Sequence, residues 1–438
     1  MESDSVGAKE FYSCSRYYKR ANIYRQWSSR PYLRTCENNY FPAGNLADEK
    51  QVNALETKNL SPFSKSDYKI ISSNNSFDSF SNPPSAFDRL WDFQNLYRAH
   101  RKARLSKRHK REVILFEKDL ALNLTKLSRA IRDGSYRMSG YYNFFVYEPK
   151  KRNISALHYV DRVVQHCLCD DILAPELDKR LIYDNVACRI GKGLSFALKR
   201  LTGFLADYYR AYGNNGYFLR CDIRKYFDSV DHDILKAKLR KIITDERLLV
   251  FLENIIDSYE TFPGKGLPMG NQTSQWFAIY YLDSFDRIIK ERFRIKYYIR
   301  YMDDCVLIHH DKQFLLGVKQ VMEDFLEKKL KLSFNEKTQI FPIRNGVDFL
   351  GFNFRLSDSG KVVRRLRPLV KRKFRRSISE IMKQYASGKL SVKEAIAPVI
   401  SYNAHLKQGH TGRLRCIALR KFVLKRSGNC DISLHKVN

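Results

Sequence analysis

Apolar and polar positions repeat with different periods along this chain, and the clearest signal is a pair of short apolar runs separated by acids. Residues 297–300 and 305–308 are rich in aromatic and β-branched side chains, which are typical of strands. The four residues between them, Tyr301-Met302-Asp303-Asp304, form a short connection. The pattern therefore predicts a β-hairpin that carries two adjacent carboxylates at its tip.

Other strands and helices follow from the same kind of pattern. A third apolar run, residues 217–221, predicts a strand that ends at Asp222, and residues 141–147 and 152–157 predict a further strand pair. Helical spacing places these apolar residues of the N-terminal half on buried helix faces: Leu90, Phe93, Leu96, Tyr97, Leu115, Leu120, Leu122, Leu124, Leu127 and Ile131. In the C-terminal part it does the same for Ile378, Ile381, Met382, Ala395, Val399 and Ile400.

The first 86 residues differ from the rest. They mix Ser, Asn, Tyr and Arg with little apolar periodicity, as in residues 72–76 and 81–85. This composition predicts a loop-rich extension that orders only on a partner.

Three carboxylates are predicted to meet where strands end. Asp222 follows one strand, and Asp303 and Asp304 occupy the tip of the hairpin. Such a set can hold two divalent cations about 4 Å apart, which would activate an attacking hydroxyl and neutralise the leaving oxygen of a phosphoryl transfer. Oxygen ligands and phosphate partners favour Mg²⁺. An Asp-Asp turn also occurs in solvated hairpins without any catalytic role, so the motif alone leaves both interpretations open.

The charge balance points to a polyanionic partner. Among 438 residues, Lys and Arg number 79 and Asp and Glu 47, which gives a formal net charge of +32. Nucleic acid is the partner that an excess of this size favours. No apolar run approaches the length of a membrane span, and the first residues lack the pattern of a secretion signal. We therefore expect a cytoplasmic protein without a membrane partner.

Two runs of basic residues contain no acid. Residues 98–111 include eight Arg or Lys among fourteen, and residues 361–376 include nine among sixteen. Solvated helix faces usually interleave both signs, so these runs predict phosphate-contacting surfaces. The residues predicted to bind nucleic acid there are Arg101, Lys102, Arg104, Lys107, Arg108, Arg364, Arg365, Lys371, Arg372 and Lys373.

The nine cysteines show no Cys-x-x-Cys pair, which argues against zinc and against a disulfide framework. Cys221 and Cys305 lie inside apolar runs, where a reduced thiol behaves as a small buried hydrophobe.

The order of the motifs resembles that of bacterial retroelement-type reverse transcriptases from about Phe93 to Arg415. Asp222 and the Tyr301–Asp304 motif resemble the two catalytic motifs of the palm, and residues 266–275 resemble the loop beneath the template base and the incoming nucleotide. Residues 332–338 resemble the motif whose lysine, here Lys337, faces the triphosphate. Phe349 and Gly351, in Phe-Leu-Gly-Phe, resemble the primer grip.

This resemblance implies an α+β right-hand polymerase. The expected organisation is an N-terminal loop-rich extension at 1–86, fingers at 87–215, a catalytic palm at 216–356 and a basic helical thumb at 357–438. It implies catalysis by Asp222, Asp303 and Asp304 with two Mg²⁺ ions, and the backbone carbonyl of Ile223 is expected to complete one coordination shell. The residues expected to contact the dNTP are Arg189, Lys192, Ile223, Phe227, Met269, Gly270, Gln275 and Lys337.

Two of these positions carry specific expectations. Phe227, five residues after Asp222, would stack beneath the deoxyribose and leave no room for a 2′-hydroxyl, so we expect selection of dNTPs. Met269-Gly270 and Ser274-Gln275 stand where most reverse transcriptases have Gln-Gly and Ser-Pro. That departure resembles the diversity-generating retroelement and defence-associated branch, and the loss of a polar glutamine suggests low fidelity. Alternatively, Met269 is simply an adequate packing substitute.

The predicted function is RNA-directed DNA synthesis in a bacterial retroelement or an antiviral defence system. The expected partners are a structured noncoding RNA template, the RNA/DNA hybrid product and dNTPs, with room for an accessory protein or an oligomer. Two alternatives remain open at this point: an RNA-binding scaffold with a degenerate polymerase core, and a protein-primed or template-independent DNA polymerase. The presence of all three palm carboxylates argues against the scaffold.

Overall fold

The computed structural model describes residues 84–147 and 151–426, and the backbone of 432–433. The predicted N-terminal extension lies outside the described residues except for its last three. Within the described residues, no helix has the length and apolar character needed to cross a membrane.

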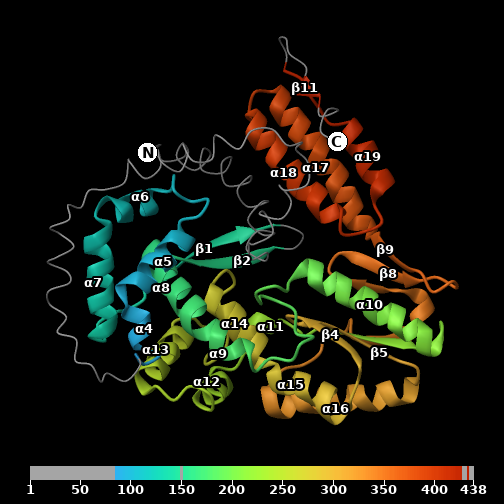
Figure 1. The fold of residues 1–438 in the computed structure, drawn as a ribbon, viewed down its shortest axis with the longest axis horizontal. Coiled ribbons are helices and arrows are strands. Elements are labelled where there is room, and N and C mark those ends of the chain that lie inside the picture. The colour runs from blue at the N-terminus through green and yellow to red at the C-terminus, as the bar shows by residue number, and fades with distance from the viewer. Residues whose placement is uncertain (1–83, 148–150, 427–431, 434–438) are drawn as a thin grey trace, which may run out of the picture. The chain divides into compact units, whose positions relative to one another are not determined.

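A group of helices forms the first part, and a two-stranded hairpin follows it (Figure 1). Its elements are α4 (Asp88–Trp91), α5 (Phe93–Ala103), α6 (Arg111–Lys118), α7 (Leu120–Arg132), β1 (Tyr141–Val146), β2 (Arg152–Leu157), α8 (Tyr159–Leu168), the π-helical turn η1 (Cys169–Leu173) and α9 (Ala174–Asp178). Asp92 caps α5 by accepting from the amide of Asn95. The predicted strands 141–147 and 152–157 are therefore confirmed within one residue.

The helical periodicity predicted more core residues here than the fold buries. Leu96, Leu124 and Ile131 are buried as expected, but Leu115 and Leu122 are 56% and 53% exposed. Phe93, at the start of α5, is also exposed. Apolar spacing marks a face of a helix, and neighbouring helices cover only part of the faces of α6 and α7.

A four-stranded antiparallel sheet forms the centre of the second part. Its strands run in the order β4 (Tyr297–Tyr301), β5 (Asp304–His309), β3 (Tyr217–Cys221) and β6 (Gln339–Pro342). Successive side chains of a strand point to opposite faces. Leu219 and Leu307 accordingly join one buried cluster, and Phe218 and Ile308 join another. Both faces are covered, which explains why most residues of β3, β4 and β5 are apolar.

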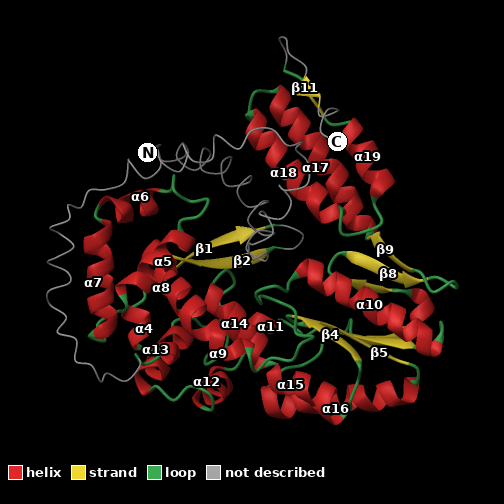
Figure 2. Ribbon diagram, viewed as in Figure 1, coloured by secondary structure: helices red, strands yellow, loops and turns green. Residues whose placement is uncertain are grey.

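Helices cover the two faces of this sheet (Figure 2). Helix α10 (Leu194–Tyr212) packs on the face that carries Phe218, and α16 (Lys312–Leu330) packs on the face that carries Leu219. The remaining elements of this part are α11 (Tyr226–Ser229), α12 (His232–Arg240), α13 (Glu246–Asp257), α14 (Gln272–Tyr281), α15 (Asp283–Arg287) and the π-helical turn η2 (Ile288–Arg292).

A second antiparallel sheet and three helices complete the described chain. After the 3₁₀ turn η3 (Ile343–Asn345), the sheet comprises β7 (Val347–Phe349), β8 (Phe352–Leu356) and β9 (Val362–Leu366). They are followed by α17 (Pro368–Ala386), α18 (Val392–Leu406), α19 (Gly412–Arg420), β10 (Val423–Leu424) and β11 (Ile432–Ser433). A third core, with Phe374, Ile381 and Val399, holds the helices together.

Two predicted domain boundaries separate residues that the structure packs together. Strand β9 pairs with β8, so the sheet that begins before residue 356 continues to Leu366. Helix α10, predicted as part of the fingers, shares a buried cluster with the central sheet. Charge and periodicity define elements, but they do not show which sheet an element joins.

Candidate active site

Strand register brings the ends of the predicted catalytic strands together. In the antiparallel pair β3–β5, Cys221 is opposite Cys305, so the next residues, Asp222 and Asp304, meet at the same end of the sheet. Tyr301 pairs with Asp304 in β4–β5, which leaves Met302 and Asp303 as the two-residue turn. The predicted hairpin with carboxylates at its tip is therefore present, and Asp222 adjoins it.

Burial raises the pKa of both carboxyl groups of the hairpin tip, and neighbouring acids add to the effect. Burial, reinforced by the charge of Asp222, raises the pKa of Asp303 to about 6. Burial also raises the pKa of Asp304 to about 7, and the charges of Asp303 and Asp222 add to this shift. Arg220, whose Nε lies 3.4 Å from Asp304 Oδ1, opposes it. Like charges held together in this way favour protons or cations as partners.

The donor set fits a divalent metal, although the described side chains do not form a ready-made cluster of three ligands. Carboxylate oxygens are the ligands that Mg²⁺ prefers, and burial, which raises the pKa of Asp303 and Asp304, opposes their ionisation unless a cation binds beside them. Two backbone bonds join the Asp222 carbonyl to Asn335 and the Arg224 amide to Ser333. Neither uses the carbonyl of Ile223, the fourth predicted metal ligand.

The segment that carries Lys337 is attached directly to the backbone of Asp222. The amide of Asn335 donates to the Asp222 carbonyl at 2.7 Å, and the Asp222 amide donates to Thr338 Oγ1 at 3.2 Å. Lys337 lies between these two anchors and is exposed. The structure thus places the predicted triphosphate lysine beside the first catalytic aspartate.

The loop with Met269 and Gly270 packs on β2. The amide of Ser155 donates to the Met269 carbonyl at 3.2 Å. Gly270 has a φ of +120°, and a Cβ there would approach Ile154 Cγ2 to 3.1 Å, so glycine suits this position in two ways. Gln275, further along in α14, accepts from Cys188 Sγ at 3.3 Å.

Phe227 sits in α11, half-buried, next to Tyr226. Its carbonyl accepts from the amide of Leu267 at 2.7 Å, which ties α11 to the loop that carries Met269. Its ring packs against the first core cluster and meets the Tyr226 ring edge-on. The contact of this ring with a deoxyribose stays a prediction.

Arg189 and Lys192 occupy different environments in the loop between α9 and α10. Arg189 is buried, and its guanidinium donates to Asp178, to the Ile182 carbonyl and to the Asn185 carbonyl. The Arg189 side chain therefore stabilises the loop through internal hydrogen bonds, whereas the sequence predicted that it contacts the triphosphate. Lys192 reaches the surface, and burial together with the charge of Arg189 lowers its pKa to about 8.

The predicted primer grip is a tight hairpin between β7 and β8. Its two turn residues, Leu350 and Gly351, have φ values of +48° and +89°. Such values are required at both central positions of a type I′ turn, which matches strand twist. Phe349 is buried, and a Cβ added at Gly351 would lie 3.7 Å from Nε2 of His405 in α18. The turn therefore joins the second sheet to the C-terminal helices.

The first basic run, residues 98–111, folds as the end of α5, a turn and the start of α6 rather than as one helix. Lys102 and Arg104 pair with acids, at 2.9 Å from Asp170 and 2.6 Å from Glu117. For Lys107, burial and the nearby charges of Arg162 and Lys110 lower the pKa to about 8. The exposed Arg101 and Arg108 also belong to this run.

The second basic run comprises β9 and the first half of α17. His410 makes two hydrogen bonds to the backbone of Arg364. Its Nδ1 accepts from the Arg364 amide at 3.0 Å, and its amide donates to the Arg364 carbonyl. Arg365, Lys371 and Arg372 are exposed, and Lys373 is half-buried.

Sequence reasoning did not identify two arginines near the carboxylates. Arg220, in β3, lies beside Asp304, and Arg152, at the start of β2, lowers the pKa of Asp303 through its charge. Each could have been suspected from its pattern: Arg220 interrupts an apolar strand two residues before Asp222, and Arg152 opens a strand next to a predicted turn.

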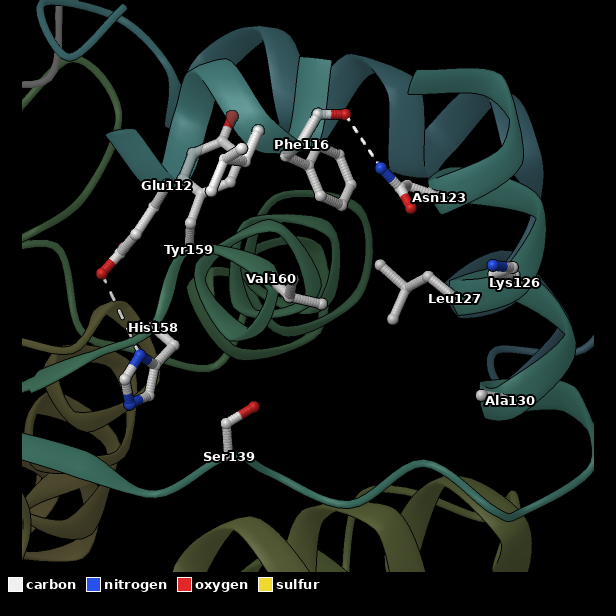
Figure 3. A pocket seen from close by; sticks show the side chains of 11 residues that line it. Glu112, Phe116, Asn123, Lys126, Leu127, Ala130, Ser139, His158, Tyr159 and Val160 are labelled. Atoms are coloured by element: carbon white, nitrogen blue, oxygen red, sulfur yellow. Dashed lines mark hydrogen bonds and ion pairs between the residues drawn. The ribbon is translucent and has the colours of Figure 1, made fainter. Parts of the chain in front are cut away.

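A cavity of about 640 Å³ lies elsewhere, among α6, α7 and α8 (Figure 3). Phe116, Leu127 and Val160 line it, and at one side His158 lies 4.0 Å from Glu112. None of the predicted catalytic or nucleotide-binding residues lines this cavity, so it is separate from the carboxylate site.

Residues 148–354 match the family model described as reverse transcriptase (RNA-dependent DNA polymerase). This stretch is similar to reverse transcriptase domains. It includes β2, the central sheet and all three aspartates. The match, with the mixed helices and antiparallel sheets around it, confirms the predicted α+β right-hand polymerase fold and supports an enzyme of the RNA-directed DNA polymerase class.

Among curated proteins, the chain is 27% identical to protein YkfC of Escherichia coli strain K12, over 30% of this chain and 44% of that protein. Among solved structures, apo telomerase from Candida tropicalis, truncated from its C-terminal domain, has a TM-score of 0.41 and 14% identity, over 52% of this chain and 55% of that one. Telomerase from Candida albicans, in complex with a fragment of telomeric RNA, has a TM-score of 0.40 and 14% identity, over 66% and 59% of the two chains. The chain thus matches 44% of the length of the curated relative and 55% and 59% of the lengths of these two telomerase chains.

Proposed function

We propose that this protein is an RNA-directed DNA polymerase that makes cDNA by two-metal-ion nucleotidyl transfer. The observation that carries the proposal is the meeting of Asp222, Asp303 and Asp304 at one end of the central sheet, inside the matched domain. The raised pKa values of Asp303 and Asp304 support it, because acids that repel one another bind cations readily.

Two Mg²⁺ ions would be held by the three aspartates and by the carbonyl of Ile223, and they would supply Lewis acidity at the attacking and leaving oxygens. The other groups bind and orient. Lys337, anchored next to Asp222, and Arg152, near Asp303, present positive charge toward a triphosphate.

Sugar choice and template fit are assigned to α11 and the adjoining loop. Phe227 is proposed to close the space beside C2′ of the incoming nucleotide. Met269 and Gly270, docked on β2, are proposed to lie beneath the nascent base pair. A thioether makes no directional hydrogen bond with a base, so low fidelity is expected at this position.

The template is proposed to be a dedicated structured RNA, bound by phosphate contacts from the two basic runs. Support comes from the net charge of +32 and from the two acid-free runs at either end of the matched domain. We further propose that the protein acts in the bacterial cytoplasm, within a retroelement or an antiviral defence system of the branch suggested by Met269-Gly270. Sequencing RNA that copurifies with the native protein tests this; a random sample of cellular RNA would remove the dedicated template.

Primer extension on an RNA template with purified protein, Mg²⁺ and dNTPs tests the activity. Asp303→Asn with Asp304→Asn should lower incorporation by at least about a thousandfold, since both metal positions lose a ligand. The matched control, Asp311→Asn with Asp324→Asn, removes two exposed carboxylates at and in α16, and Asn also serves at the N-cap position of Asp311. The control should extend like wild type.

Two other results would change the assignment. Undiminished extension by the Asp303/Asp304 variant would remove the two-metal site from these residues. Extension that needs no RNA or that labels the protein itself would favour the template-independent or protein-primed alternative.

A further inference from the structure

The catalytic turn contains a strained residue. Met302 has a φ of +57°, a left-handed conformation that glycine adopts far more easily. A strained residue persists only when its surroundings hold it. Here Arg300 Nη1 donates to the Met302 carbonyl at 2.8 Å, two residues along the same hairpin.

Arg300 is itself fixed by a buried network. It is 1% exposed, and it donates through Nε and Nη2 to the two oxygens of Asp286, at 2.6 and 2.5 Å. Nη2 also donates to the carbonyl of Ile279 at 3.0 Å. Ile279 lies in the last turn of α14, where carbonyls have no partner inside the helix and where a cation is favoured.

The same network reaches the loop that carries Arg189 and Lys192. The Arg300 amide donates to the Asp184 carbonyl, and the Arg300 carbonyl accepts from the Val186 amide, both at 3.0 Å. Between them, Asn185 Nδ2 lies 3.4 Å from Asp286 Oδ2. One buried ion pair thus contacts the catalytic turn, α14, α15 and this loop.

We propose that Arg300, held by Asp286, is a positioning residue for the reaction: it fixes the catalytic turn and couples that turn to the loop of residues 184–192. The inference rests on the proposed polymerase function. Arg300 is enclosed and its donors point to protein acceptors, so it acts through Met302 and the adjoining Asp303 rather than on substrate. Removing its hydrogen bond frees the strained turn to relax, which displaces Asp303 relative to Asp222.

The test removes the pair without leaving a buried charge behind. Arg300→Met with Asp286→Leu replaces both members by apolar side chains of similar size, which buried ion pairs often tolerate. We expect a cooperatively folded protein whose kcat for primer extension falls by about a hundredfold, as small misplacements of catalytic groups do. KM for primer–template should stay within about threefold, because the basic runs are untouched.

The matched control is Arg287→Met with Asp283→Leu, an ion pair at 3.2 Å in the same helix, α15, that does not contact the hairpin. It should keep the kcat of wild type. A readout independent of activity is amide hydrogen exchange: in the Arg300/Asp286 variant, exchange should rise at 302–305 and 184–193 and stay unchanged in the thumb helices.

The outcomes separate this inference from the proposed function. No extension by wild-type protein would defeat the polymerase assignment, whereas a wild-type kcat in the Arg300/Asp286 variant would defeat the positioning role alone. If the double variant does not fold, Arg300→Lys keeps a cation beside Asp286 but cannot also reach the Met302 carbonyl. Wild-type kcat and wild-type exchange at 302–305 in that variant would overturn the inference equally.

Discussion

The catalytic hairpin has two sides of opposite electrostatic character. On the buried side, Asp286 is fully enclosed and accepts from Arg300, Tyr298 and Asn185. On the other side, burial raises the pKa of Asp303 and Asp304, the charge of Asp222 adds to both shifts, and Arg220 contacts Asp304 at 3.4 Å. Asp286 thus has protein donors for both of its oxygens, whereas Asp303 and Asp304 are available to bind a ligand. The difference separates a carboxylate that holds the structure from the carboxylates that we propose bind the metal ions.

The largest expected effect comes from breaking the buried side. Arg300→Met alone leaves Asp286 buried without its cation, so it should lower the free energy of unfolding by about 3–5 kcal/mol. Asp303→Asn with Asp304→Asn should cost nothing measurable, or stabilise the metal-free protein, because it removes repulsion. Urea unfolding of both variants without divalent cations measures the contrast. Equal destabilisation by the two variants would show that the two sides of the hairpin do not differ in their contribution to stability.

Most of the catalytic end could be predicted from sequence because its elements are local. The hairpin at 301–304 and the strand before Asp222 follow from apolar runs of strand length, and their antiparallel pairing then brings the acids together. Each of these elements depends on residues that are neighbours in the chain.

Features that depend on distant partners were not predictable in this way. Arg189 looks like a phosphate ligand in a Gly-Lys-Gly segment, yet Asp178 and two carbonyls enclose it. Arg300 stands beside the catalytic motif, but its role depends on Asp286, fourteen residues earlier and on another element. Leu115 is 56% exposed and lies at the cavity among α6, α7 and α8, where the described elements cover its face of α6 only in part. Composition and spacing do not encode such contacts.

A similar contrast, between side chains that have a partner of opposite charge among the described residues and side chains that do not, is found in the first basic run. Lys102 and Arg104 have acid partners, while Lys107 lies among cations. Replacing Arg101, Lys107 and Arg108 with Gln should therefore flatten the dependence of log affinity on log salt by about two to three units for the copurifying RNA. Lys102→Gln with Arg104→Gln, the matched control, should change it by less than about one unit. Equal slopes in all three proteins would reduce this run to a solvated surface.

A smaller effect is expected at α11, where two adjacent aromatic residues differ in how fully the protein buries them and bonds to them. Tyr226 is buried and donates to the Ala278 carbonyl at 2.5 Å, whereas Phe227 is half-buried and only its backbone carbonyl is bonded to the Met269 loop, at Leu267. Phe227→Val should lower the preference for dNTPs over rNTPs by about tenfold, by opening space for a 2′-hydroxyl. Phe325→Val, at a half-buried ring of the same core, controls for lost packing. An unchanged preference would make Phe227 a core residue only.

The smallest expected effect is a pH dependence of stability that belongs to the open side of the hairpin. Unfolded aspartates have a pKa near 4, whereas Asp303 and Asp304 in the folded protein have pKa values of about 6 and about 7. Between about pH 4 and about pH 7 the folded protein therefore binds more protons than the unfolded chain, and its stability falls as pH rises through this range.

Wild type should consequently lose on the order of 1 kcal/mol or more, relative to the Asp303→Asn/Asp304→Asn variant, between about pH 5 and about pH 8 in the absence of divalent cations. Comparing the two proteins cancels the contribution of groups that they share, such as the histidines. Mg²⁺ competes with protons for the carboxylates, so adding it at about pH 8 should restore the stability of wild type and leave the variant unchanged. The difference in stability between the two proteins could instead stay constant with pH and with Mg²⁺. Asp303 and Asp304 would then be solvated independently, and the contrast between the two sides of the hairpin would rest on Asp286 and Arg300 alone.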